Sequence, residues 1–312
     1  MTPTPTPTPT LVEIIAALRA GERTLRVLDP DHGRGLHAGE TVERGGVAYV
    51  HRPWRVWVDL AERLGLRLLT PRRIDETLVE LRFEPLARPA TDAPSDGPTD
   101  APADVTEKYG AGSPFARISK HEEPGFVIDL EEALARVPLP PSPSLRLLDL
   151  GVNTGDELTL LLALRPELRG QLDVVGVDHS ASAIAVARER FAGERARFVV
   201  ADLANLGLLE LGRFDLVLSI GTLQSGALDD RALLRQVVQH NLTDAGSVIL
   251  GMPNCRYVDG ELEYGARVVN LREPELGLLV KDVAFYRKYL QQHRRRVFVT
   301  GKHYLFITAI PA

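Results

Sequence analysis

One stretch in the middle of the chain, residues 144–180, constrains the fold more than any other part of the sequence. It reads SLRLLDLGVNTGDELTLLLALRPELRGQLDVVGVDHS. Two short apolar runs, residues 146–150 and 174–178, flank a glycine-containing turn and a Leu-rich segment of helical length. Continuous apolar runs of this kind are typical of parallel strands that are covered on both faces. The stretch therefore predicts a βαβ unit, and such units hold nucleoside-bearing cofactors at the carboxyl ends of their strands.

The turn after the first strand contains Gly151, Asn153 and Gly155. Glycine allows backbone angles and a close ligand approach that a Cβ atom would block, and Asn visits left-handed geometry at low cost. A nicotinamide-binding turn, G-x-G-x-x-G, would need glycines at positions 153 and 156, where this chain has Asn153 and Asp156. Asp156 would also repel a pyrophosphate bound at the start of the helix. The spacing thus disfavours a nicotinamide cofactor.

Acids at the two strand ends, Asp149 and Asp178, complete a larger pattern. It resembles that of the class I (Rossmann-like) S-adenosylmethionine (SAM)-dependent methyltransferases, whose first signature reads roughly acid-x-Gly-x-Gly-x-Gly. Asn153 replaces the middle glycine here. The resemblance implies SAM as the cofactor and an α/β fold with a doubly wound, seven-stranded, mostly parallel sheet whose last two strands are antiparallel. The alternation of helices and strands alone shows only an α/β sheet.

The resemblance also implies roles for individual side chains at the cofactor. Asp149 holds the turn and the amino group of SAM, Asp178 accepts hydrogen bonds from the ribose hydroxyls, and Asp202 contacts the adenine amine. The implied cofactor set is Asp149, Gly151, Asn153, Gly155, Asp178, Asp202, Leu203 and Ser219. Each acid taken alone also fits a helix-capping residue, which is the alternative interpretation.

The methyl acceptor is less constrained, because an activated sulfonium requires orientation more than a fixed catalytic motif. The loop at residues 219–225 lacks the Asn/Asp-Pro-Pro-aromatic motif of enzymes that methylate exocyclic amines of adenine or the side chain of glutamine. The candidate acceptor-binding residues are Thr222, Gln224, Asn254 and Tyr257. In the segment that precedes the first strand, Arg117, Lys120 and His121 could pair with the SAM carboxylate or serve as a base, and His121 is the candidate catalytic residue, with an ordinary surface histidine as the alternative.

Composition divides the chain into four parts. Residues 1–10 form a Thr-Pro repeat, which predicts a disordered tail, and residues 11–86 predict a small α+β module. Residues 87–105 are rich in Pro and Asp and lack large apolar side chains, so we expect a disordered linker. Residues 106–312 form the expected SAM-dependent methyltransferase domain.

Charge and cysteine content exclude several classes of protein. The 312 residues carry a formal net charge of −5, which argues against a protein that coats nucleic acid. Cys255 is the single cysteine, so a disulfide within the chain and a Cys-based zinc site are excluded, and we expect no metal. No run is long enough to span a membrane and the start does not resemble a signal peptide, so we expect a cytoplasmic protein.

A basic cluster at Arg294–Arg296 could bind RNA or a phosphate. The alternative interpretation is a solvated helix end, where cations interact favourably with the helix dipole. The cluster precedes a predicted strand, and so should lie at the edge of the sheet opposite the cofactor. We therefore favour a small-molecule acceptor over RNA, while the acceptor itself and the oligomeric state stay open. The leading hypothesis is a SAM-dependent methyltransferase, and the alternative is a non-catalytic SAM-binding or scaffold protein with the same fold.

Overall fold

The computed structural model describes residues 9–87, 105–107, 110–113, 116, 118–138, 144–226, 228–258, 260–264 and 279–312. The chain divides into two compact units, Met1–Thr91 with Tyr257–Tyr264 and Asp92–Arg256 with Gly265–Ala312. Most of the Thr-Pro tail and of the linker expected from the sequence lies outside the described residues. None of the helices in the described part of the chain is long and apolar enough to cross a lipid bilayer.

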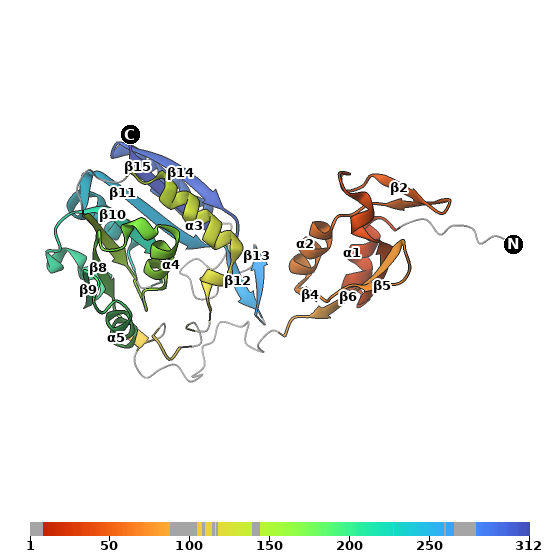
Figure 1. Ribbon diagram of the computed structural model, residues 1–312, viewed down its shortest axis with the longest axis horizontal. Helices are drawn as coiled ribbons and strands as arrows, with labels where there is room; N and C mark the ends of the chain where they lie inside the picture. The colour runs from red at the N-terminus through yellow and green to blue at the C-terminus, as the bar shows by residue number, and fades with distance from the viewer. Residues whose placement is uncertain are drawn as a thin grey trace. The chain divides into compact units, whose positions relative to one another are not determined.

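The N-terminal unit is a small α+β module whose helices pack on an antiparallel sheet (Figure 1). Thr10 caps the first helix, because its side chain accepts from Glu13 N while the Glu13 side chain reaches back to Thr10 N. Trp57 and Leu81 are at the centre of the module's core. The elements are α1 (Leu11–Arg19), β1 (Thr24–Leu28), η1 (Pro30–Gly33), β2 (Thr41–Arg44), β3 (Val47–Val50), α2 (Trp54–Leu64), β4 (Leu66–Leu68), β5 (Arg72–Arg73) and β6 (Leu78–Pro85).

The C-terminal unit is built on a seven-stranded sheet with the order β14-β15-β11-β10-β7-β8-β9 (Figure 1). Its strands are β7 (Leu145–Leu150), β8 (Leu172–Asp178), β9 (Ala196–Val200), β10 (Phe214–Ile220), β11 (Leu242–Pro253), β14 (Arg295–Gly301) and β15 (Tyr304–Pro311). All neighbours are parallel except β15, which runs antiparallel to both β11 and β14. The strand order reverses between β7 and β10, and ligands of open α/β sheets bind at such a reversal.

Helices cover both faces of this sheet, and α3 and α4 lie together on one of them (Figure 1). The helices are α3 (Pro124–Arg136), α4 (Asp156–Leu164), α5 (Ala181–Arg190), α6 (Asp230–Gln236) and α7 (Leu279–Gln292). Short turns of helix are η2 (Val105–Glu107), η4 (Lys120–Glu122), η5 (Pro166–Leu168), η6 (Leu203–Leu209) and the π-helical η7 (Val237–Asn241). The apolar strand residues alternate between the two helical layers, which explains why the strands read as continuous apolar runs.

The expected fold class is confirmed, including the antiparallel last pair of strands. Two hairpins were not predicted. One joins β2 and β3, and the other joins β12 (Cys255–Val258) and β13 (Glu261–Tyr264). Both are two-stranded and too short to show a period-two pattern over several residues.

Candidate functional site

The turn that follows β7 has the geometry that its sequence predicts. Gly151 and Gly155 have φ angles of +77° and +82°, and Asn153 has a φ of +47°. These values lie in the left-handed region, which glycine and asparagine adopt at low cost. The turn is tied to the neighbouring strand, because Gly151 N donates to Val177 O at 2.8 Å. The backbone of the turn thus follows the edge of the sheet where β7, β8 and β10 end, which we call the carboxyl edge.

Both glycines of the turn are also required by packing. A Cβ atom at Gly151 would lie 2.1 Å from Thr222 Oγ1, and one at Gly155 would lie 2.5 Å from the ring of Phe191. The Thr222 hydroxyl lies within hydrogen-bond distance of Leu150 O, at 3.1 Å. Thr222, an expected acceptor-binding residue, therefore also supports the cofactor turn from the end of β10.

Asp178 connects the turn to the next helix. Its Oδ2 accepts from Asn153 N and its Oδ1 accepts from Ser180 N, both at 2.9 Å. The side chain is buried, yet each carboxylate oxygen keeps a further lone pair for a ligand. Two acceptor oxygens held rigidly at the end of β8 suit a pair of vicinal ribose hydroxyls.

Asp149 is the most unusual group at the carboxyl edge. It is 2% exposed, and its Oδ2 has no hydrogen-bond partner among the described residues. Burial raises the pKa of Asp149 well above its ordinary value, and the nearby carboxylates of Glu157 and Asp178 raise it further, while Lys120 lowers it. A buried acceptor without a partner destabilises the protein unless a ligand satisfies it. A cationic group, such as the ammonium of an amino acid, would satisfy Oδ2 and stabilise the charged form.

Lys120 is the cation nearest to these acids. Its Nζ donates to Glu157 Oε1 at 2.8 Å and lies 5.4 Å from the centroid of the Tyr304 ring. Burial lowers the pKa of Lys120, but the Glu157 carboxylate and Tyr304 raise it, and the net direction is upward. Lys120 is consequently a stable ammonium ion, held in place by α4 and by the start of β15.

A second part of the segment before α3 covers the start of α5. Glu107 Oε2 accepts from Ser180 Oγ at 3.0 Å and from Ser182 Oγ, and Glu107 Oε1 accepts from Ser182 N at 3.1 Å. These hydrogen bonds, led by that of the Ser182 side chain, lower the pKa of Glu107. Ser180 N also donates to Asp178 Oδ1. The hydrogen bond between Ser180 and Glu107 therefore places Glu107 beside the expected ribose site.

The remaining expected cofactor residues differ in their surroundings. Asp202 is exposed, and its Oδ1 accepts from Ala204 N at 2.9 Å. In this structure it thus acts as the N-cap of η6, which is the alternative role considered for it. Leu203 is buried in the core on the α6 and α7 side of the sheet. Ser219 is fully buried near the end of β10, and its Oγ is without a hydrogen-bond partner in the described structure.

Each of the expected acceptor-binding residues has its own set of contacts in the described structure. Gln224 is 7% exposed, and its Oε1 finds no partner in the part of the chain described. Asn254 donates to Lys302 O at 2.8 Å and thereby ties the end of β11 to the β14–β15 turn. Tyr257 belongs to the N-terminal unit. His121 lies in η4 with a buried Nε2 that none of the described groups bonds, and Arg117 lies outside the described residues.

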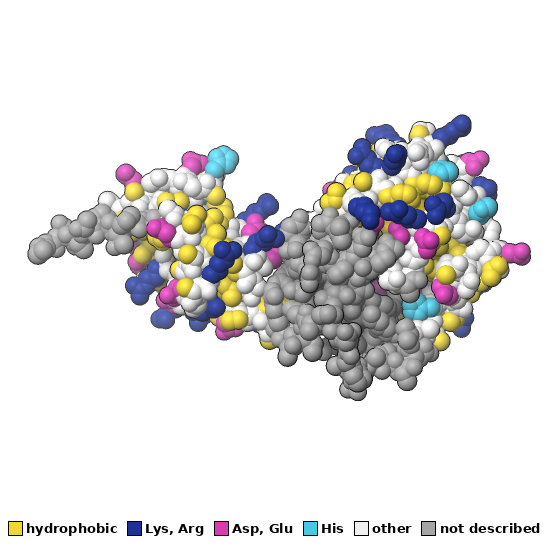
Figure 2. Space-filling model, turned by 180° about the vertical axis from the view of Figure 1, so that it is seen from behind, with side chains coloured by type: hydrophobic (Ala, Val, Ile, Leu, Met, Phe, Trp, Pro, Cys, Tyr) yellow, Lys and Arg dark blue, Asp and Glu magenta, His cyan; other side chains and the backbone are white. Residues whose placement is uncertain are grey.

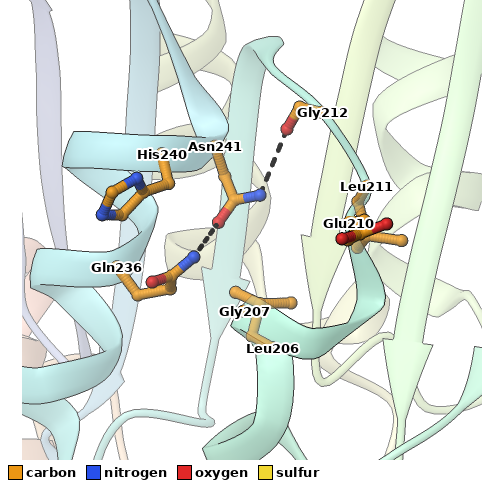
Figure 3. Close-up of a pocket in the computed structure, with 8 residues that line it drawn as sticks. All are labelled: Leu206, Gly207, Glu210, Leu211, Gly212, Gln236, His240 and Asn241. Atoms are coloured by element: carbon orange, nitrogen blue, oxygen red, sulfur yellow. Dashed lines mark hydrogen bonds between the residues drawn. The ribbon is translucent and has the colours of Figure 1, made fainter.

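A hollow of about 300 Å³ lies at the opposite, amino-terminal edge of the sheet (Figure 3). It is lined by Leu206, Gly207, Glu210, Leu211, Gly212, Gln236, His240 and Asn241. Gln236 Nε2 donates to Asn241 Oδ1 at 3.4 Å and Asn241 Nδ2 donates to Gly212 O at 3.1 Å, so these amides are satisfied by the protein itself (Figure 3). Gly212 precedes β10 and Asn241 precedes β11, which separates this hollow from the cofactor turn.

Sequence reasoning missed three contributors to the site: Glu107, Glu157 and Tyr304. Glu157 appears in the sequence as an ordinary acid in the first turn of a helix, where acids are favoured by the helix dipole. Its 8% exposure is the sign of a special role, and burial is not visible in the sequence. Tyr304 reads as one more aromatic residue of a strand. Among the described residues, no group of three or more His, Cys, Asp or Glu could hold a metal ion.

Comparison with known proteins supports this geometry. Residues 147–244 match a family model described as a methyltransferase domain. This range begins in β7 and ends in β11, so it includes the turn, Asp149, Asp178 and Ser219. No curated protein matches the chain.

Solved structures of low sequence identity resemble the chain as well. An O-methyltransferase family protein from Burkholderia thailandensis is 16% identical, with a TM-score of 0.46 over 66% of this chain and 64% of that protein. A putative methyltransferase in complex with the Trm112 activator from Haloferax volcanii is 16% identical, with a TM-score of 0.46 over 68% and 100%. The magnesium protoporphyrin IX methyltransferase of Synechocystis PCC 6803, solved with SAM, is 18% identical, with a TM-score of 0.40 over 69% and 87%.

The family match covers the turn and both strand-end acids, and the surrounding sheet has the seven strands and the antiparallel last pair that the resemblance implies. The chain carries a methyltransferase domain of the class I SAM-dependent superfamily, whose cofactor is S-adenosylmethionine.

Proposed function

We propose that this protein transfers the methyl group of SAM to a small-molecule acceptor. Asp149 carries the proposal, because its buried Oδ2 has no hydrogen-bond partner in the described structure and it faces a glycine turn at the strand reversal. SAM offers an ammonium for Asp149 and ribose hydroxyls for Asp178. When bound, SAM supplies the activated methyl group, while the chain's residues orient it and exclude water.

The roles of the side chains follow from their positions. Gly151 and Gly155 let the methionine part lie close to the backbone of the turn. Asp178 holds the ribose, and the Glu107 contact at the start of α5 covers the same side of the site. Ser219 and Gln224, which have buried oxygens without partners among the described residues, lie at or just after the end of β10, where the acceptor would approach.

Two measurements test the proposal in sequence. Calorimetric titration with S-adenosylhomocysteine (SAH) tests the cofactor, and we expect one site per chain. Incubation with methyl-labelled SAM and separate pools of phenols, carboxylic acids, amines and RNA tests transfer. Label in any small-molecule pool supports the proposal. Label in RNA alone would overturn the acceptor class, and SAH binding without transfer to any pool would favour a non-catalytic SAM-binding protein.

A further inference from the structure

Tyr304 lies at the carboxyl edge in a fixed orientation. It is the first residue of β15 and pairs with Pro253, the last residue of β11. Its ring makes an edge-to-face contact with Phe126 at a centroid distance of 5.1 Å and lies 6.0 Å from the ring of Phe306. These contacts restrict the ring, so the direction of the hydroxyl group is set by the core beneath α3.

Gly221 leaves the space that this hydroxyl occupies. A Cβ atom at Gly221 would lie 2.8 Å from Tyr304 Oη and 3.9 Å from Lys120 Nζ. The next residue, Thr222, packs against the position of Gly151 in the cofactor turn. A continuous set of contacts therefore joins the cofactor turn, the end of β10 and the Tyr304 hydroxyl.

The hydrogen-bond direction between Lys120 and Tyr304 is determined by chemistry. Lys120 Nζ donates to Glu157 Oε1 and lies, like Tyr304 Oη, within 4 Å of the position of a Cβ atom at Gly221. An ammonium group can only donate, so in any interaction of these two groups Lys120 is the donor. The phenol oxygen acts as the acceptor, and its own proton points to a third group. A phenol that accepts from a cation is a stronger donor, because hydrogen bonds in a chain polarise one another.

We propose that Tyr304 donates a hydrogen bond to an oxygen of the methyl acceptor, with Lys120 as its positioning residue, and that the acceptor is an oxygen nucleophile in its anionic form, such as a phenolate or a carboxylate. The inference rests on the proposed methyl transfer. A hydrogen bond from the Tyr304 hydroxyl stabilises an anionic oxygen. Such an oxygen still has further lone pairs with which to form the bond to the methyl carbon. A neutral amine has only one lone pair, and the same hydrogen bond would occupy it.

The balance of the step follows directly. The acceptor loses its proton to solvent when it binds. An oxygen lone pair then forms the new bond to the methyl carbon, and the electron pair of the sulfur–carbon bond returns to sulfur, which gives neutral SAH. Tyr304 keeps its proton throughout.

The charges around Tyr304 agree with a donor role. Burial raises the pKa of Tyr304, Lys120 lowers it, and Glu157 and the buried Cys255 raise it, so the net direction is upward. The phenol therefore stays protonated at neutral pH. Asp149 completes the charged surroundings of Lys120 on the cofactor side.

The ionisation of 4-nitrophenol, which absorbs differently as phenol and phenolate, tests the inference in the SAH-saturated full-length protein. We expect the wild type to bind the phenolate form and to lower the apparent pKa of the probe. Tyr304→Phe should weaken phenolate binding by about tenfold or more, the effect of losing one hydrogen bond to a charged group. Tyr289→Phe is the matched control, because Tyr289 belongs to the helical layer on the other face of the sheet.

The Lys120 variants separate positioning from general structure. Lys120→Met should weaken phenolate binding, Lys120→Arg should restore part of it, and Lys120→Met should add little once Tyr304→Phe is present. SAH calorimetry on the same samples keeps the two proposals apart, since loss of SAH binding in the wild type refutes the cofactor site. With SAH binding intact, the acceptor inference is overturned if the wild type does not bind the probe, binds it as the neutral phenol, or binds it no better than Tyr304→Phe.

Discussion

At the scale of single residues, Asp149 shows a conflict between stability and ligand binding. Its folded pKa is raised, so its favourable contribution to folding is complete below the unfolded pKa of about 3.8 and is lost as the pH rises through the folded pKa. Asp149→Asn cannot ionise, so the variant does not lose stability at high pH in this way. At about pH 9 we expect the variant to melt higher than the wild type by roughly 2–4 °C, equivalent to about 1 kcal/mol in a unit of this size, and calorimetric scanning measures the difference.

The same substitution should weaken SAH binding, because a neutral amide cannot pair with the ligand's ammonium. SAH binding to the wild type should release a proton from Asp149, and its affinity should rise with pH up to the folded pKa of that group. Calorimetric titrations with SAH in buffers of different ionisation enthalpy measure how many protons are released on binding. A wild-type affinity that does not vary with pH, or an Asp149→Asn protein that melts lower and binds SAH equally well, would contradict the assignment.

Gly151 permits a second test at this scale, with an internal control. Gly151 and Gly170 have nearly equal φ angles, +77° and +76°, but a Cβ atom at Gly170 meets nothing within 4 Å. Gly170→Ala therefore reports backbone strain alone, at about 1 kcal/mol, whereas Gly151→Ala adds the clash with Thr222. We expect a larger drop in melting temperature and a loss of SAH affinity only for Gly151→Ala. Equal effects of the two variants on both measurements would refute the packing argument.

At the scale of elements, the start of α5 depends on Glu107, which reaches it from the segment before α3. The folded pKa of Glu107 is lowered, so the contact is present above the unfolded pKa of about 4.5 and is lost as the pH falls through the folded value. We expect Glu107→Ala to speed amide hydrogen exchange at residues 180–183 and to weaken SAH binding several-fold at neutral pH. Glu13→Ala, which removes the hydrogen bonds that the Glu13 carboxylate accepts from Thr10 at the start of α1, should leave both unchanged. Unaltered exchange in the Glu107→Ala protein would show that the contact does not hold the helix start.

How far the sequence predicts these elements depends on the range of the interactions that define them. The βαβ unit from β7 to β8 is local, and its apolar runs, glycines and acids identify it within forty residues of sequence. The meeting of Lys120, Glu157 and Tyr304 joins residues from η4, α4 and β15, and no local pattern marks it. Similarly, α6 continues directly into the π-helical η7 at Val237, and the local sequence does not mark this change of helix type.

At the scale of the whole molecule, the basic cluster Arg294–Arg296 lies at the edge of the sheet opposite the cofactor turn. Figure 2 shows Lys and Arg side chains gathered on the upper part of the C-terminal unit. Arg295 pairs with Pro311 at the amino-terminal edge of the sheet and donates to Thr243 O at 2.9 Å, while Arg294 and Arg296 are exposed. We expect the double substitution of Arg294 and Arg296 by Ser to leave the salt dependence of RNA retention unchanged, as should Arg44→Ser in the N-terminal unit. A slope lower by about 2 in the double variant alone would make RNA the leading acceptor class.

The central claim is that SAM binds along the carboxyl edge with its ribose on Asp178, and calorimetry of Asp178→Ala tests it most directly. The matched control is Asp173→Ala, which changes a half-buried acid near the other end of the same strand, where it pairs with Arg146 at 3.5 Å. Methylthioadenosine, which keeps the ribose but lacks the amino acid, serves as a second ligand beside SAH. Hydrogen bonds to a charged group contribute about 1.5–3 kcal/mol each, so Asp178→Ala should bind both ligands at least about tenfold more weakly, while Asp149→Asn should weaken SAH alone. A folded Asp178→Ala protein that binds SAH and methylthioadenosine as tightly as Asp173→Ala would contradict the account.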